Sequence, residues 1–430
     1  MNNQHLREKL RYELAEARAE TDRLFAMIAP EAMHQRPIPE RHRVIFYLGH
    51  LEAFDWNMIC ATSFGMPSFN SQFDHLFEFG IDPVDGELPA DQPSDWPAVK
   101  EILSYRDRVR TTVDGLLDRV TLENPAPPFV ENGQIFRVAI EHRLMHAETL
   151  AYMFHWLDYD LKQSPTLQSR PDTNRSRSRS QSVRILEGDT TLGQKPNSDS
   201  FGWDNEFACH SVFVPEFSID NLNVTNADFL EFVRADGYQH RSLWSDEGWT
   251  WIQQTGTKHP KFWIRRGEVW FYRTMFEEIP LPPDWPVYVS HAEANAYACW
   301  KGKSLPTEAQ YHRAAFGSPD GSEQPPPRGN FDFHSWSPDP AGAYPDRASP
   351  FTIYDLVGNG WEWTSTPFAP FEGFEPFPFY RGYSANFFDG KHFVLKGASP
   401  RTAALLVRKS FRNWFQAYYP NIYATFRCVQ

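Results

Sequence analysis

The stretch FRVAIEHRLMHAETLAYMFHWL, residues 136–157, decides the fold of the first part of this chain. Apolar and polar residues alternate through it with the period of an amphipathic helix. His142 and His146 stand four residues apart, so a helix places both imidazoles on one face, one turn from each other. The spacing alone leaves two interpretations open: a pair of metal ligands, or two polar residues on an ordinary helix.

Three further stretches upstream repeat the helical pattern and complete a predicted four-helix bundle. They cover residues 6–25, 50–64 and 96–120. Residues 69–97, between the second and third stretches, are rich in Pro, Gly and Asp, which predicts a long irregular crossover. A bundle of four helices with one long crossover can hold a site in its interior.

A third histidine lies in the second of these helices. His50 has the apolar neighbours Leu48, Leu51 and Phe54 on its two sides, so we expect its side chain to point into the bundle. A histidine buried there needs a hydrogen-bond partner or a metal. Three neutral imidazoles without a thiolate or carboxylate fit Zn(II) or Fe(II), and the residues alone do not separate these ions. Such a set leaves coordination positions open for a substrate or O2.

The chain of 430 residues is long enough for two cores, and its composition changes once along its length. Residues 1–160 form the predicted bundle, and residues 161–187 form a polar, Ser/Arg-rich stretch that we interpret as a linker. Residues 188–430 contain short apolar stretches among many Gly, Pro, Asn and Trp residues. Only two helices are predicted there, over 226–235 and 290–303, which indicates an α+β domain dominated by loops.

Charge and composition exclude several classes of protein. The net charge of −13 argues against nucleic-acid binding, and no apolar run is long enough to span a bilayer. The N-terminus lacks the apolar core of a signal peptide. The four cysteines are far apart and form no CxxC pair, which favours reduced thiols and a cytoplasmic location.

Three strings in the second half carry a family resemblance. They are FGWDNEFACHSVFVPEFSIDNLNVTNADFLEFV, KGKSLPTEAQYHRAAFG and DLVGNGWEWTSTPF, which begin at residues 201, 301 and 355. Together they resemble the formylglycine-generating, or sulfatase-modifying, enzyme fold, a C-type-lectin-like scaffold. That enzyme works through a pair of cysteines near its end, whereas Cys428 stands alone here, so its chemistry is not implied.

The histidine-bearing first domain resembles the DinB-like four-helix bundle. A DinB-like bundle followed by this second domain is similar to the ergothioneine sulfoxide synthases (EgtB type), the ovothiol synthases and the selenoneine synthases (SenA type). The resemblance covers nearly the whole chain. It implies that His50, His142 and His146 bind Fe(II), and that hercynine, a histidine derivative, binds through its imidazole.

Two strings of the second domain match family stretches that contact the substrate. YRGYSANFF implies that Tyr380 supplies a catalytic phenol and that Tyr383 contacts the substrate imidazole. SFRNWFQ implies that Asn413 and Trp414 hold the trimethylammonium end of hercynine. An indole face attracts a quaternary ammonium, which no hydrogen bond can satisfy. For each aromatic side chain the alternative interpretation is plain packing.

The predicted donor pocket departs from the synthases that take γ-glutamylcysteine. Those carry Asp after the Asn-Trp pair and Arg shortly beyond, where this chain has Phe415 and Tyr419, and their crossover tyrosines and arginines are absent. A Gln that touches the imidazole in some members is Met145 here. Apolar rings cannot pair with a charged donor, so the pocket disfavours γ-glutamylcysteine. The strings HRLMHAET and DWPAVKEILSYRDRVR resemble the ovothiol and selenoneine branches.

The sequence therefore predicts an Fe(II)- and O2-dependent synthase that attaches sulfur or selenium to C2 of the hercynine imidazole. A selenosugar donor is favoured. One alternative is a hercynine sulfoxide synthase that uses cysteine or γ-glutamylcysteine. Others are a zinc-dependent DinB-type thiol transferase and a binding module without turnover. The sequence leaves the oligomeric state open.

Overall fold

The computed structural model describes residues 3–78, 89–123, 126–164, 179–195 and 201–430. The chain divides into two compact units, Met1–Leu167 and Gln168–Gln430. The predicted linker, 161–187, falls mainly on residues that lie outside the described part, and its last residues already include β1 (Ser182–Ile185) of the second unit. Within the described ranges, no helix is both long and apolar enough to cross a bilayer.

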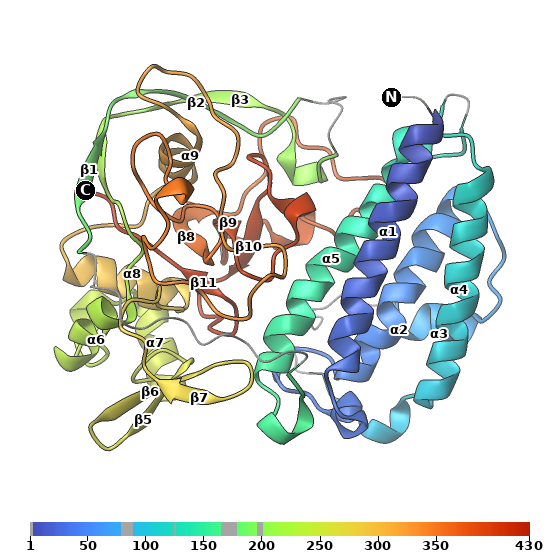
Figure 1. Ribbon diagram of the computed structural model, residues 1–430, viewed down its shortest axis with the longest axis horizontal. Helices are drawn as coiled ribbons and strands as arrows, with labels where there is room; N and C mark the ends of the chain where they lie inside the picture. The colour runs from blue at the N-terminus through green and yellow to red at the C-terminus, as the bar shows by residue number, and fades with distance from the viewer. Residues whose placement is uncertain (1–2, 79–88, 124–125, 165–178, 196–200) are drawn as a thin grey trace. The chain divides into compact units, whose positions relative to one another are not determined.

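Four long helices build the first unit (Figure 1): α1 (Asn3–Ala26), α2 (Val44–Asp55), α4 (Val99–Arg119) and α5 (Gln134–His155). α1 packs against α5 and α2 packs against α4, while α2 also meets α5 and α1 meets α4. This closed ring of contacts is the four-helix bundle that the sequence predicted.

The interior of the bundle is formed by α2 and α5. Every residue of α2 is buried, and so are most residues of α5, including both of its predicted ligands. α4, in contrast, buries one stripe of residues, as expected of a helix that faces water on its other side. That stripe is Ile102, Tyr105, Val109, Val113 and Leu117. α2 continues directly into a π-helical stretch, Trp56–Ser63, a form often found beside functional sites.

The crossover between α2 and α4 contains a short helix, α3 (Ser71–Leu76), where the sequence predicted irregular structure. The Asn70 side chain caps it by accepting a hydrogen bond from the Phe73 N–H at 3.1 Å. Just beyond α3, the ring of Phe77 rests on Gly49 of α2, where a Cβ atom would lie 2.5 Å from the ring carbons. Glycine at this position therefore lets the crossover approach α2 closely.

The largest sheet of the second unit has the strand order β10-β9-β8-β11. Its strands are β8 (Gly360–Pro367), β9 (His392–Ala398), β10 (Asn413–Gln416) and β11 (Ala424–Thr425). β9 pairs antiparallel with β8 and β10, whereas β11 lies parallel to β8. Residues 368–391, which join β8 to β9, contain one short 3-10 turn, Ala385–Phe387, and no strand.

Smaller ribbons and four helices complete the described part of the second unit. β1 pairs with β4 (Phe217–Asp220), β2 (Gly188–Leu192) pairs with β3 (His210–Val214), and β5 (Trp263–Arg266), β6 (Val269–Arg273) and β7 (Glu278–Pro280) form a three-stranded sheet. The helices are α6 (Asn226–Arg234), α7 (Asp246–Thr255), α8 (His291–Trp300) and α9 (Glu308–Phe316).

The prediction of two helices in this unit was incomplete, because it identified only α6 and α8. α7 and α9 span ten and nine residues, fewer than the roughly 11–18 over which a helical period is read from a sequence. Their N-caps were the available signal: Ser245 accepts from the Gly248 N–H at 3.0 Å, and Thr307 forms a reciprocal capping box with Gln310.

Candidate metal centre and aromatic cluster

Three imidazoles converge inside the first unit, two from α5 and one from α2. The Nε2 atom of His146 lies 3.2 Å from Nε2 of His50 and 3.1 Å from Nε2 of His142. All three side chains are buried. In the described part of the chain, they form the one group of three or more His, Cys, Asp or Glu side chains placed to share an ion.

The hydrogen bond on the far side of one ring fixes its tautomer. Nδ1 of His50 lies 2.7 Å from the backbone carbonyl oxygen of Phe77, so this nitrogen must carry the proton and donate it. Nε2 of His50 is therefore left with a free lone pair that faces the other two rings. In most metal sites each histidine ligand donates its other ring N–H to an acceptor such as a backbone carbonyl, and this hydrogen bond orients the ring.

The separations fit a single transition-metal ion. Two nitrogens about 2.1 Å from one ion, at angles between octahedral and tetrahedral, lie roughly 3.0–3.4 Å from each other. The His146–His142 and His146–His50 separations, 3.1 and 3.2 Å, fall within this range, and all three ligand nitrogens lie within 4.8 Å of one another. A set of three imidazoles leaves further positions of such an ion to other ligands, and it suits Fe(II) as well as Zn(II).

Burial keeps these imidazoles in the neutral form that binds metals. Desolvation lowers the pKa of His50 from 6.5 to about 4, although the hydrogen bond to Phe77 opposes this change. Desolvation also lowers the pKa of His142 and His146 well below the usual value. Aromatic rings provide much of the apolar surroundings: Phe54 stacks on His142 with ring centroids 3.5 Å apart.

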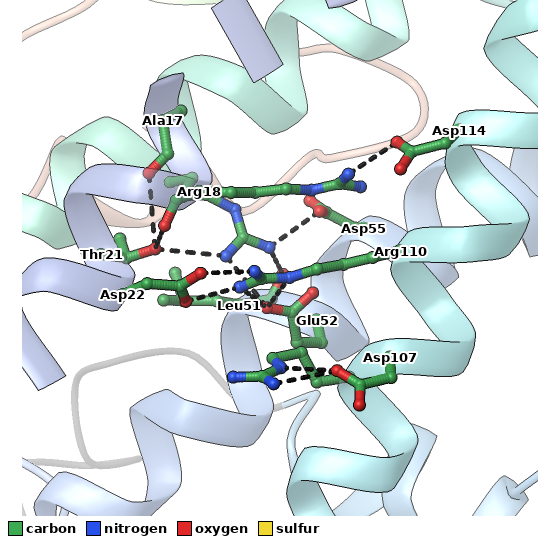
Figure 2. A network of polar contacts seen from close by, with 12 residues as sticks. Ala17, Arg18, Thr21, Asp22, Leu51, Glu52, Asp55, Asp107, Arg110 and Asp114 are labelled. Carbon is green, nitrogen blue, oxygen red and sulfur yellow. Dashed lines mark hydrogen bonds and ion pairs between the residues drawn. The ribbon is translucent and has the colours of Figure 1, made fainter. Parts of the chain in front are cut away.

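A buried ionic network joins the helices that carry the histidines (Figure 2). Arg143, beside His142 on α5, donates to Oε1 of Glu52 at 3.1 Å and to Oδ2 of Asp55 at 2.8 Å, both on α2. Arg110 of α4 donates to the same Glu52 and to both oxygens of Asp22 on α1. The network thus connects all four long helices and fixes the register between α2 and α5.

The charges of this network depend on one another because they are out of water. Burial alone would raise the pKa of Glu52, but Arg143 and Arg110 outweigh burial and lower it to about 2. For Asp55 burial dominates, so its pKa is raised despite the neighbouring Arg143. Removing one partner of such a buried ion pair costs several kcal/mol of folding stability, because the remaining charged groups stay buried without an opposite charge.

The second unit brings three of the predicted residues together in an aromatic cluster. The ring centroid of Tyr383 lies 5.7 Å from that of Tyr380 and 5.3 Å from that of Trp414, which it meets edge to face. Trp414 also stacks on Phe368 at 4.2 Å. Desolvation, followed by the negative charge of Asp204, raises the pKa of Tyr380 to about 12, so its phenol keeps its proton at neutral pH.

Known families match both units. Residues 13–150 match the DinB superfamily, and residues 167–430 match the sulfatase-modifying factor enzyme 1-like domain. The hercynine oxygenase of Mycolicibacterium smegmatis is 33% identical over 346 residues, which cover 76% of this chain and 76% of that protein. The chain belongs to the EgtB-like family.

Two other relatives are similar to the chain over about half of their own length. Ergothioneine biosynthesis protein 1 of Neurospora crassa is 28% identical over 94% of this chain and 55% of its own length. The hercynine oxygenase of Mycobacterium tuberculosis is 36% identical over 55% of this chain and 57% of its own length. The chain therefore spans about half the length of these two EgtB-like proteins.

Other predicted site residues of this EgtB-like chain lie differently. Successive residues of a strand point to opposite faces, so on β10 Asn413 and Phe415 lie on the face opposite Trp414. Phe415 stacks on Tyr419 with ring centroids 5.5 Å apart, and the two form a flat apolar pair. Met145 is half-buried on α5, one residue before His146.

Sequence reasoning missed several residues that hold these sites. They are the Phe77 carbonyl, Arg143 and the turn that contains Trp203 and Asp204. The carbonyl leaves no trace in a sequence. Arg143 stands between the two histidines of HRLMH, with Ala139 and Ala147 one helical turn away on either side, and an arginine on this apolar face was a usable signal. The string FGWDNEF signalled its buried acids in the same way.

Proposed function

We propose that this protein is a non-heme Fe(II)- and O2-dependent synthase that forms a C–S or C–Se bond at C2 of the hercynine imidazole. The observation that carries the proposal is the convergence of three neutral, buried Nε2 atoms at separations that suit one ion. The names of its EgtB-like relatives, hercynine oxygenase and ergothioneine biosynthesis protein 1, support hercynine as the substrate.

His50, His142 and His146 would hold the ion. Bound Fe(II) would supply the one-electron chemistry that O2 needs in order to react with closed-shell substrates. The sulfur reaction balances when the C2–H bond of hercynine and the S–H bond of the donor are replaced by a C–S bond. One atom of O2 then remains as a sulfoxide oxygen, and the other leaves as water with the two hydrogens.

The residues of the second unit would bind the substrate and control a proton. Because burial raises its pKa to about 12, Tyr380 keeps its phenol proton at neutral pH. The phenol would donate this proton only to a group that becomes more basic during the reaction. Tyr383 would contact the substrate imidazole. The indole face of Trp414 would attract the trimethylammonium group. Asn413, which lies on the other face of β10, would not share this contact. Met145 is the proposed neighbour of the imidazole from the first unit.

The identity of the sulfur or selenium donor is proposed from the side chains of Phe415 and Tyr419. Their stacked rings offer no charge to the ammonium and carboxylate groups of γ-glutamylcysteine, which supports a less charged donor. We propose a selenosugar as the donor, with cysteine and γ-glutamylcysteine as the alternatives.

The test uses protein purified without oxygen and loaded with Fe(II). Hercynine and O2 are offered with cysteine, γ-glutamylcysteine or a selenosugar in parallel, and the products are identified by mass. We expect a hercynine adduct with the selenosugar, and the mass also shows how many oxygen atoms the product keeps. Stoichiometric zinc in the purified protein, with no O2 uptake in the presence of hercynine, would instead support a zinc-dependent thiol transferase.

A variant separates an enzyme from a binding module. His142→Ala is expected to abolish product formation, because the ion loses one of its three protein ligands. The matched control is His75→Ala, which removes an exposed imidazole from α3 and should change nothing. Equal rates in the two variants would contradict the proposed metal centre.

A further inference from the structure

A four-residue turn, Trp203–Glu206, is buried in the second unit and has no part in the function proposed above. Its last three residues form a 3-10 turn, Asp204–Glu206. All four side chains are at most 1% exposed, although three of them are polar. Polar residues are rarely buried so completely unless they hold something in place.

The carboxylate of Asp204 contacts both ends of the segment that carries the two tyrosines. Its Oδ1 atom accepts a hydrogen bond from the Ser384 hydroxyl at 2.6 Å. Burial raises the pKa of Asp204, and the hydrogen bonds from Ser384 and from the backbone amide of Phe377 oppose this shift. Between these ends the backbone makes only turns, in which the N–H groups of Tyr380 and Tyr383 each bond to a carbonyl three residues earlier.

The indole of Trp203 packs against the aromatic rings of the same segment. Trp203 stacks on Tyr383 with ring centroids 3.9 Å apart and planes inclined by 23°. The same indole lies 6.5 Å from the ring of Tyr380 and 6.3 Å from that of Phe377. Three rings at every third position of the segment therefore meet one fully buried tryptophan.

The second acid of the turn, Glu206, binds residues that precede the strand of Trp414. Glu206 accepts hydrogen bonds from Nε of Arg408 at 2.8 Å and from the Ser410 hydroxyl at 2.6 Å. It also accepts from the backbone N–H of Trp203 at 2.9 Å, which ties the carboxylate to its own turn. Arg408 and Ser410 immediately precede β10, the strand that presents Trp414.

We infer that the Trp203–Glu206 turn positions the aromatic cluster through two separate anchors. Asp204 fixes the segment of Tyr380 and Tyr383, and Glu206 fixes the approach to Trp414. These are positioning residues, and the kinetic part of this inference rests on the proposed function. Residues 377–384 have no helix or strand of their own to fix them, so one lost anchor should release one segment and leave the other in place.

Hydrogen–deuterium exchange of the full-length protein tests the two anchors without any substrate. Asp204→Ala and Ser384→Ala should speed exchange of amides in residues 377–388 and leave residues 404–412 unchanged. Glu206→Gln should do the reverse. Asp320→Ala is the control, because this exposed carboxylate accepts only local bonds from Ser318 and Ser322. Faster exchange throughout the second unit in every variant would show a merely structural turn and overturn the inference.

Steady-state kinetics with hercynine then separate the two anchors by their effect on turnover. Asp204→Ala should lower kcat by about 100-fold, because a displaced phenol no longer meets the reacting atoms, and should raise KM by a smaller factor through the displaced Tyr383. Glu206→Gln should mainly raise KM for hercynine, by roughly tenfold, through a displaced indole. Asp204→Asn keeps an oxygen acceptor for Ser384 and should recover part of the lost kcat. Equal kcat and KM changes in both variants would contradict separate anchors.

One further variant distinguishes failure of this inference from failure of the proposed function. Tyr380→Phe removes the phenol and leaves Asp204 in place. If Tyr380→Phe turns over like the wild type, the role proposed for the phenol is wrong, and the exchange measurements still decide whether the turn holds the segment. If Tyr380→Phe is inactive and Asp204→Ala keeps full kcat, the positioning role is wrong.

Discussion

Three imidazole nitrogens meet in the bundle because they project from two regular, buried helices whose register is fixed by Arg143. Tyr380, Tyr383 and Trp414 meet in the second unit although the segment that carries the two tyrosines has neither helix nor strand. The histidine cluster thus depends on helix packing, and the aromatic cluster depends on a few side chains of a separate turn. Substitutions in the two regions should therefore produce different kinds of failure.

The largest expected effect comes from removing a ligand. His146→Ala leaves two imidazoles for the ion, so we expect the Fe(II) affinity and the turnover to fall by more than about 100-fold. Tyr380→Phe should lower turnover while the iron content stays that of the wild type. Iron analysis of both proteins after gel filtration checks this difference. An iron content of His146→Ala equal to that of the wild type would contradict the expected difference between the two regions.

The next largest effect concerns the ionic network. Arg143→Met leaves Asp55 buried without its ion-pair partner and Glu52 with Arg110 alone, so the free energy of unfolding should fall by about 3–5 kcal/mol. Urea unfolding of the metal-free protein measures this loss. Arg184→Met, which breaks an exposed pair with Glu216, is the control and should change stability too little to measure. Equal midpoints for the two variants would contradict a network that fixes the helices.

A smaller effect follows from pH. An unfolded His50 takes up a proton below pH 6.5, whereas the folded side chain stays neutral until about pH 4. The free energy of unfolding of the metal-free protein should therefore be highest above pH 6.5 and fall between pH 6.5 and 4, by about 3 kcal/mol from this residue. In His50→Gln the free energy of unfolding should depend less steeply on pH. Urea unfolding of both proteins in the presence of a chelator, repeated across this pH range, checks the prediction. The same dependence of the free energy of unfolding on pH in both proteins would refute it.

The same pH range should leave the phenol of Tyr380 protonated, because burial raises its pKa to about 12. The smallest effect is expected in the aromatic cluster. Trp414→Leu removes the cation–π partner and should raise KM for hercynine by roughly 3- to 30-fold with unchanged iron content. Trp300→Leu, on α8, is the control for loss of an indole outside the cluster. Unchanged KM in Trp414→Leu would assign that indole to packing.

The sequence predicts the bundle well because the helical period is local. Residues at i and i+4 share a face whatever the rest of the chain does, so His142 and His146 could be paired from their spacing. His50 could be added because its neighbours are apolar. The four long helices follow from the same periodicity, and their packing into a bundle is confirmed.

The anchors of both clusters could not be predicted, because each joins residues far apart in the chain. Asp204 and Ser384 are 180 positions apart, and Arg143 is 88 positions from Asp55. Neither pair has a periodic signal. The short helices α7 and α9 were missed for another reason: they span only ten and nine residues, too few for a helical period to stand out in the sequence.

The complete burial of α2 has a consequence for how this protein can acquire new substrates. Every one of its side chains touches neighbours, so almost any replacement on that helix disturbs the packing around His50. Most side chains of residues 368–391 are half-buried or exposed, and those outside the Tyr380–Ser384 segment tolerate exchange far better. Directed evolution towards a different chalcogen donor should therefore accumulate its successful changes in the loops of the second unit, while libraries built on α2 yield mostly unfolded protein.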